Sequence, residues 1–148
     1  MNAATLPANQ DLLLLDTHVL VWLMFGESRL GSRAKAEIAR VGNAGDLLVS
    51  AITPWEIGVL VSKKRIDLHR DTLVWIRDAL AMSGISLTSL DPEIAVASTR
   101  LPFKMHPDPA DRILVATARH LGATLVTADR ALFDLAKKGH FRAMDAAK

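Results

Sequence analysis

The sequence contains no cysteine, and this absence removes several kinds of chemistry. Disulfide bonds, thiolate metal sites and a cysteine nucleophile are all excluded. The chain also has no apolar run near the roughly 18 residues that a transmembrane helix needs, so we expect no membrane span. Together these absences fit a cytoplasmic protein in a reducing environment.

Tyrosine is absent as well, and aromatic residues make up only 5% of the chain. Trp22, Trp55 and Trp75 stand among apolar residues at helical spacing, which favours a place in the core over stacking on nucleic-acid bases. The formal net charge is only +2, so binding of a nucleic acid would need a local basic patch. The densest basic run consists of Lys63, Lys64 and Arg65.

The length of 148 residues, with 50% hydrophobic and 23% charged residues, is typical of one globular domain. Residues 1–10 have neither periodicity nor a long apolar core with basic flanks, so we expect a flexible tail and not a signal peptide. Residues 11–148 are predicted to form a single domain, because no linker, repeat or low-complexity segment interrupts them.

Short apolar segments alternate with helical patterns along this domain. Strands are predicted at residues 12–16, 46–50, 85–90 and 123–127, with a final edge strand at 140–144. Helices are predicted at residues 18–26, 32–42, 53–64, 71–84, 91–101, 108–122 and 129–139. In the third helix, Thr53 is expected as the N-cap and Glu56 as its partner in a capping box. The alternation predicts an α/β fold with a mostly parallel central sheet flanked by helices on both faces.

Acidic residues lie near the ends of the predicted strands, where an open α/β sheet binds its ligands. Asp16 ends the first strand, Glu56 follows the second, and Asp129 follows the strand that ends at Thr127. Asp111 lies in the first turn of the helix before that strand, and the sequence does not fix which edge of the sheet it faces. If this helix starts at the same rim, all four acids meet there.

Each of these acids alone has a structural explanation, because acidic residues are common at helix starts. As a group, however, they repel one another, which raises their pKa values or demands a counter-charge. Helix N-termini supply part of that charge, and a divalent cation supplies the rest. A set of oxygen ligands, with no cysteine and no histidine pair at zinc-protease spacing, favours Mg²⁺ or Mn²⁺ over Zn²⁺.

Four segments resemble, in the same order, the motifs of a known family: LLLLDTHVLVWLM, SAITPWEIGVLVSKKRIDL, HPDPADRILVATA and ATLVTADRAL. They are similar to the motifs of PIN-domain ribonucleases, and most closely to those of the VapC toxins of bacterial toxin–antitoxin pairs. Because the resemblance extends from Leu12 to about Phe133, it implies a single PIN-like domain.

The resemblance implies an endoribonuclease that depends on Mg²⁺, with Mn²⁺ as a substitute, and hydrolyses RNA phosphodiester bonds with a metal-activated water. Its catalytic and metal-binding residues would be Asp16, Glu56, Asp111 and Asp129. Thr17 and Thr127 stand beside motif acids and are candidates to orient a carboxylate or a water, although bonding to local backbone explains them equally well. For Asp108, helix capping is the first expectation.

The resemblance also implies partners. Candidates for contact with RNA phosphates are Lys63, Lys64, Arg65, Arg112 and Arg130. A solvated helix end explains the basic run equally well, and Arg112 would also suit an ion pair with a nearby carboxylate. A VapB-type antitoxin would cover the acidic site, and the toxin would form a homodimer, giving a heterotetramer or a larger assembly.

Two other functions compete with this one. A receiver-like phospho-acceptor module is also α/β and binds Mg²⁺ in an acidic pocket, but the only early partner for Asp16 is Asp11, and Asp91 suits a helix cap better than a phospho-acceptor. A non-catalytic PIN-like binding protein would be favoured by loss of a motif acid, and all four acids are present.

Overall fold

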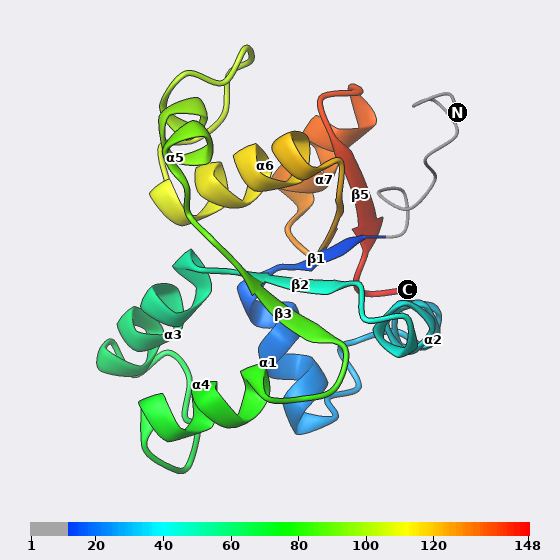
Figure 1. Ribbon diagram of the computed structural model, residues 1–148, viewed down its shortest axis with the longest axis vertical. Helices are drawn as coiled ribbons and strands as arrows, with labels where there is room; N and C mark the ends of the chain where they lie inside the picture. Colours follow the sequence, from blue (N-terminus) through cyan, green and yellow to red (C-terminus); the bar gives the residue numbers. More distant parts are fainter. Residues whose placement is uncertain (1–11) are drawn as a thin grey trace.

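The computed structural model describes residues 12–148, which form a five-stranded sheet with helices around it (Figure 1). In chain order the elements are β1 (Leu13–Leu15), α1 (Thr17–Phe25), α2 (Ser32–Asn43), β2 (Leu47–Ser50), α3 (Ile52–Ser62), α4 (Thr72–Leu80), β3 (Ile85–Thr88), α5 (Pro92–Thr99), α6 (Pro109–Leu121), β4 (Thr124–Thr127), α7 (Arg130–Lys137) and β5 (Arg142–Asp145). The predicted tail at residues 1–10 and the start of the predicted domain at residue 11 lie outside the described residues.

The strands lie in the order β3-β2-β1-β4-β5, and every neighbouring pair is parallel. The prediction of an α/β fold with a mostly parallel sheet is therefore confirmed. From β1 the chain proceeds to β2 and β3 on one side, and it returns to place β4 and β5 on the other side. This reversal creates a topological switch point between β1 and β4, where α/β proteins bind ligands at the carboxyl ends of the strands.

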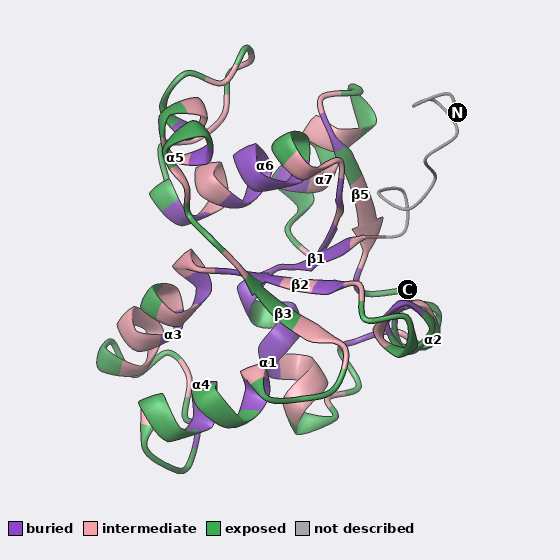
Figure 2. Cartoon of the chain, in the orientation of Figure 1, coloured by how far each residue is buried: buried purple, intermediate pink, exposed green. Residues whose placement is uncertain are grey.

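Alternating side chains of the central strands build two cores, one on each face of the sheet. Leu13 and Leu15 of β1 pack with α1, α2, α3 and α4, whereas Leu14 packs with α6 and α7. Figure 1 shows these two helix groups on opposite sides of the sheet. The central strands β1, β2 and β4 are buried along most of their length, and the edge strand β3 is more exposed (Figure 2).

Several boundaries differ from the predicted ones by a few residues. The helix predicted to run to Gly84 ends at Leu80, because the chain then forms a turn in which the Ile85 amide donates to the Met82 carbonyl at 3.2 Å. The edge strand predicted at residues 140–144 is β5 at Arg142–Asp145. Within the described part of the chain, no helix has both the length and the apolar character needed to cross a membrane.

Gly84 occupies a position that only glycine fills without distortion. Its φ is +89°, and an added Cβ would lie 2.1 Å from the Gly42 carbonyl oxygen. We therefore expect Gly84→Ala to lower the free energy of unfolding by roughly 3 kcal/mol or more, since backbone strain and overlap with backbone atoms add together. Urea unfolding followed by circular dichroism measures the change.

Gly58 provides the matched control, because it lies within α3 and no atom is within 4 Å of an added Cβ. Gly58→Ala should raise stability by about 0.5–1 kcal/mol, as expected for Gly to Ala inside a helix. Equal effects of the two substitutions would contradict the proposed contact between Gly84 and Gly42.

Candidate metal centre

The end of β1 and the end of β4 are joined directly by side chains at the switch point. Asp16 follows β1, and its Oδ2 accepts a hydrogen bond from Thr127 Oγ1 of β4 at 2.7 Å. Its Oδ1 accepts from the Thr17 amide at 2.7 Å, so Asp16 also caps α1. Asp16 therefore caps α1 and at the same time lies at the predicted site.

Glu56 enters the same site from α3, but not as the helix cap that was predicted. The capping box is wrong: α3 begins at Ile52, its N-cap is Ala51, and Thr53 is fully buried. Thr53 Oγ1 lies 3.3 Å from Thr17 Oγ1, and Thr17 donates a short hydrogen bond to Glu56 Oε1. The N-cap lies two residues earlier than expected, and the Glu56 side chain accepts its hydrogen bond from Thr17 of α1 instead of from its own helix end.

Helix α6 starts at the same rim, which the sequence alone did not determine. Asp108 caps it, as expected, by accepting from the Asp111 amide at 3.1 Å. The Asp111 side chain lies in the first turn and is 16% exposed. The charges of Asp16, Glu56 and Asp129 raise its pKa, so these acids lie close enough to Asp111 to repel it.

Asp129 is held by Thr127 and by its own helix. Its amide donates to Thr127 Oγ1 at 3.0 Å, and its Oδ1 accepts from the Leu132 amide at 3.2 Å as the cap of α7. The hydroxyl of Thr127 thus donates to Asp16 and accepts from Asp129. Both candidate threonines, Thr17 and Thr127, therefore form hydrogen bonds with acidic residues of the site.

Burial makes ionisation of the acids costly. It raises the pKa of Asp16, although the hydrogen bonds from Thr127 and Thr17 oppose this effect. Burial also raises the pKa of Glu56, opposed by the hydrogen bond from Thr17 and reinforced by the charges of Asp16 and Asp108. The hydroxyl donors therefore partly stabilise the charged carboxylates but do not remove the cost.

The pKa of the Asp111 carboxyl group is strongly raised as well. Burial, followed by repulsion from the surrounding acids, raises its pKa to about 8. These acids are Asp16, Asp108, Glu56 and Asp129. A divalent cation would reverse this effect, because its charge favours the ionised form of every carboxylate near it.

The donor atoms are spaced as ligands of metal ions are. Two triads share Asp111, and in each of them one ligand atom per residue lies within 4.8 Å of the others. The triads are Glu56, Asp108 and Asp111, and His106, Asp111 and Asp129. Asp16 belongs to neither, and its buried side chain lies within electrostatic range of both. The donor chemistry therefore fits one or two divalent ions at this rim.

Thr127→Val tests how far Asp16 depends on its hydroxyl partner. The substitution leaves a nearly buried carboxylate oxygen and the Asp129 amide without a partner, which should cost about 1–3 kcal/mol of stability. Any activity of the site should fall about 10–100-fold, because the orientation of an acid is lost. Thr124→Val on the same strand is the control, and its effect should remain within about 0.5 kcal/mol. Similar stability losses for both variants would contradict a special role of the Thr127 hydroxyl.

The basic residues predicted to contact RNA fall into two groups. Lys63, Lys64 and Arg65 follow α3 and are exposed. Arg130 is exposed too, and it pairs with Asp145 at 3.1 Å. Arg112 instead bonds within the chain, with Nε donating to the Ser98 carbonyl at 2.8 Å and Nη1 to the Met105 carbonyl at 3.4 Å. These two hydrogen bonds account for the position of the Arg112 guanidinium without an RNA phosphate or a carboxylate as its partner.

From the sequence, His106 is interpreted as a surface loop residue, with contact to a phosphate as the alternative, yet it borders the acidic cluster. Its Nε2 lies 3.4 Å from Asp111 Oδ2. The usable signal was its position in the segment HPDP, where two prolines restrict the backbone in front of the motif acid.

With this geometry in place, comparison with known proteins defines the class. Residues 13–138 match the PIN domain family, and the chain belongs to that family. Among individual proteins, it is 34% identical over 119 residues to Ribonuclease VapC22 of Mycobacterium tuberculosis, and the alignment covers 80% of this chain and 88% of that protein.

Solved structures agree with the fold. The structure of VapBC2 from Rickettsia felis bound to a DNA fragment from their promoter has a TM-score of 0.59 at 12% identity, covering 90% of this chain and 97% of that chain. FitAcB from Neisseria gonorrhoeae has a TM-score of 0.62 at 20% identity, covering 91% and 98%. The strand order also differs from the 2-1-3-4-5 order of receiver domains, so the receiver alternative is set aside.

Proposed function

We propose that this protein is a Mg²⁺-dependent endoribonuclease of the VapC toxin type. The observation that carries the proposal is the convergence of Asp16, Glu56, Asp111 and Asp129 at one rim of the sheet, in a chain that is similar to Ribonuclease VapC22 over most of its length. We expect it to act in the cytoplasm, where cellular RNA is found.

The acids would hold one or two Mg²⁺ ions, and Mn²⁺ would substitute. A bound ion would lower the pKa of a water and stabilise charge on the leaving oxygen of the phosphodiester. Asp111 lies in both donor triads and would contribute most to binding, whereas Asp16 fixes the base of the site through Thr127 and Thr17. No covalent nucleophile is required, and we leave open whether Glu56 or Asp129 orients the attacking water.

RNA would approach along α3 towards the acids. The basic run begins at Lys63, seven positions after Glu56 and about 10 Å further along the axis of α3. Arg130 follows Asp129 directly, at the start of α7. With few aromatic side chains, recognition would depend on the phosphate backbone and the shape of the RNA.

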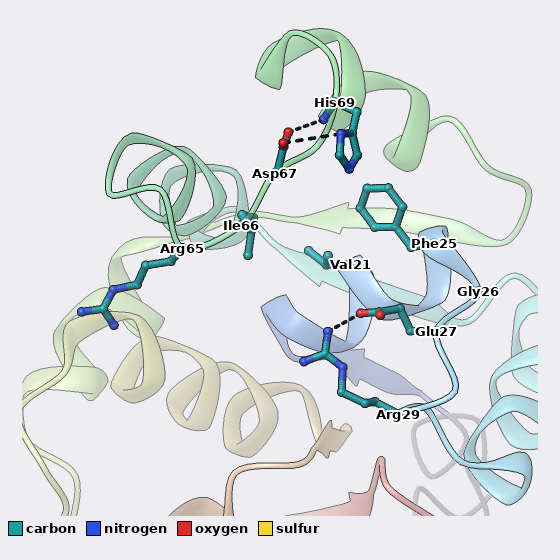
Figure 3. A pocket seen from close by; sticks show the side chains of 9 residues that line it. All are labelled: Val21, Phe25, Gly26, Glu27, Arg29, Arg65, Ile66, Asp67 and His69. Carbon is teal, nitrogen blue, oxygen red and sulfur yellow. Dashed lines mark hydrogen bonds and ion pairs between the residues drawn. The ribbon is translucent and has the colours of Figure 1, made fainter.

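A VapB-type antitoxin is the proposed partner. The structural neighbours include VapBC2 of Rickettsia felis and a toxin–antitoxin complex from Klebsiella pneumoniae. A pocket of about 520 Å³ lies beside the exposed Phe25 of α1 (Figure 3). Charged groups of both signs border it: Arg29 pairs with Glu27, His69 pairs with Asp67, and Arg65 lies at its edge. Leu73 and Val74 on α4 add exposed apolar surface. Apolar contacts surrounded by charged groups of both signs suit an amphipathic segment of the antitoxin.

A homodimer is proposed as well, with a heterotetramer or larger assembly when antitoxin is bound. The prediction that Trp55 lies in the core is wrong, because its side chain on α3 is 55% exposed. Together with the exposed Leu87 of β3 and Val96 of α5, it would offer apolar contacts to a second copy. Analytical ultracentrifugation of the protein with and without its antitoxin tests this assembly.

The central experiment is cleavage of a panel of RNAs by the full chain freed of antitoxin. We expect cleavage with Mg²⁺ or Mn²⁺ and none in EDTA. The alternative function, a PIN-fold protein that only binds a partner, predicts partner binding without cleavage in any metal. Absence of cleavage across structured and unstructured RNAs would therefore overturn the proposed activity.

A further inference from the structure

The two donor triads at the acidic rim differ in their chemistry. Glu56, Asp108 and Asp111 offer oxygen atoms only, which suits Mg²⁺. The other triad adds the imidazole nitrogen of His106 to Asp111 and Asp129. Imidazole nitrogen is a poor ligand for Mg²⁺ and a better one for transition-metal ions. The two possible ion positions are therefore not equivalent.

His106 Nε2 and Asp111 Oδ2 lie close enough to each other for both atoms to reach one ion. Their 3.4 Å separation exceeds the usual range of about 2.7–3.2 Å for an N–H···O hydrogen bond. Two adjacent ligands of an octahedral ion, each bound at about 2.1–2.2 Å, lie roughly 3 Å apart. A small inward movement of His106, whose side chain is 37% exposed, would complete such a pair.

The loop that carries His106 is held in place by its sequence and by α6. His106 and Asp108 each precede a proline, which confines their backbone to extended conformations. Arg112 of α6 donates to the carbonyls of Met105 and Ser98, and so ties the residue before His106 to the end of α5. The chain therefore orders this loop in advance, next to the motif acids.

We propose that His106 is a metal ligand, and that with Asp111 and Asp129 it forms an ion position that prefers Mn²⁺ to Mg²⁺. This inference rests on the proposed nuclease function and specifies its metal site. The all-oxygen triad would hold Mg²⁺, and Asp111 belongs to both triads. In this arrangement Arg112 is a positioning residue, because it acts through the loop that presents the imidazole.

Pulsed electron paramagnetic resonance of the full chain loaded with MnCl₂ tests the nitrogen ligand directly. The Mn²⁺ spectrum should show hyperfine coupling to one histidine ¹⁴N, and His106→Gln should abolish it. His18→Gln is the matched control, because His18 is exposed in the first turn of α1, near Asp16, and belongs to neither triad. It should retain the coupling. Absence of ¹⁴N coupling in the natural sequence, or its loss in His18→Gln alone, would overturn the proposal.

Ion affinity gives a second measurement that does not depend on catalysis. By isothermal titration, His106→Gln should weaken Mn²⁺ binding about tenfold or more and change Mg²⁺ binding less than about threefold. Equal losses for both ions would contradict a selective nitrogen ligand, and circular dichroism confirms that the variant is folded. If the protein cleaves RNA but its Mn²⁺ spectrum shows no ¹⁴N coupling, only the role of His106 is overturned. If the ¹⁴N coupling is present but no RNA is cleaved, only the proposed nuclease activity is contradicted.

Discussion

Replacing Asp111 by asparagine is expected to abolish metal-dependent cleavage and, in the absence of metal, to stabilise the protein. Asp111 is the residue common to both donor triads, so its loss should reduce cleavage by about 10³-fold or more, beyond the roughly 10–100-fold typical of residues that only orient a ligand. Its stability effect has the opposite sign, because asparagine keeps the shape of the side chain and removes a charge that repels its neighbours.

The pH dependence of this stabilisation follows from the raised pKa of Asp111. The group has its ordinary pKa of 3.8 when unfolded and a pKa of about 8 when folded, so ionisation costs folding free energy. That cost is absent below pH 3.8, grows as pH rises, and is complete above about pH 8. Its upper limit is about 6 kcal/mol, and we expect about 1–3 kcal/mol because the remaining acids relax.

Urea unfolding in EDTA at pH 4 and at pH 8.5 measures this effect. The Asp111→Asn variant should exceed the natural sequence in stability at pH 8.5 and match it at pH 4. Added Mg²⁺ should stabilise the natural sequence more than the variant, since only the former retains the shared ligand. Asp78→Asn on the exposed face of α4 is the control, and it should show neither the pH dependence nor the loss of cleavage. A variant less stable than the natural sequence at pH 8.5 would contradict the repulsion at the site.

The sheet was predictable because its strands are encoded by local patterns. Runs such as LLLLD and ATLVT are apolar on both faces, and this is what a strand buried between two helix layers requires. The positions of Asp16 and Asp129 followed directly, because the carboxyl ends of parallel strands share one edge. The positions of these two acids could therefore be predicted from the direction of the strands alone.

Other parts of the site depend on packing that the sequence does not express. The direction of α6, and hence the rim that Asp111 faces, is set by contacts with α5 and α3. Glu56 matched a capping box by spacing, but α3 starts at Ile52, where the buried Thr53 meets Thr17. Arg112 resembled a phosphate contact because it follows a motif acid, whereas its guanidinium bonds to backbone carbonyls that only the folded loop brings near.

Asp16→Asn should strongly reduce cleavage while leaving the fold and its stability nearly unchanged. The amide oxygen still accepts from the Thr17 amide, and the amide nitrogen faces the Thr127 hydroxyl, which can rotate to accept a hydrogen bond. Loss of the buried charge removes the cost of desolvation that raises the pKa of Asp16, and this offsets the weaker hydrogen bonds.

Asp16→Asn thus removes the charge of this side chain but keeps its hydrogen bonds, so it tests whether catalysis needs the charge. We expect cleavage to fall about 10²–10³-fold, comparable to losing one preorganised electrostatic group, with a change in unfolding free energy within about 1 kcal/mol. Single-turnover cleavage at saturating Mg²⁺ and urea unfolding at pH 7.5 measure the two quantities. Full Mg²⁺-dependent cleavage by a folded Asp16→Asn protein would show that the buried acid at the switch point is structural only, and the catalytic site would then have to be built from the two triads above it.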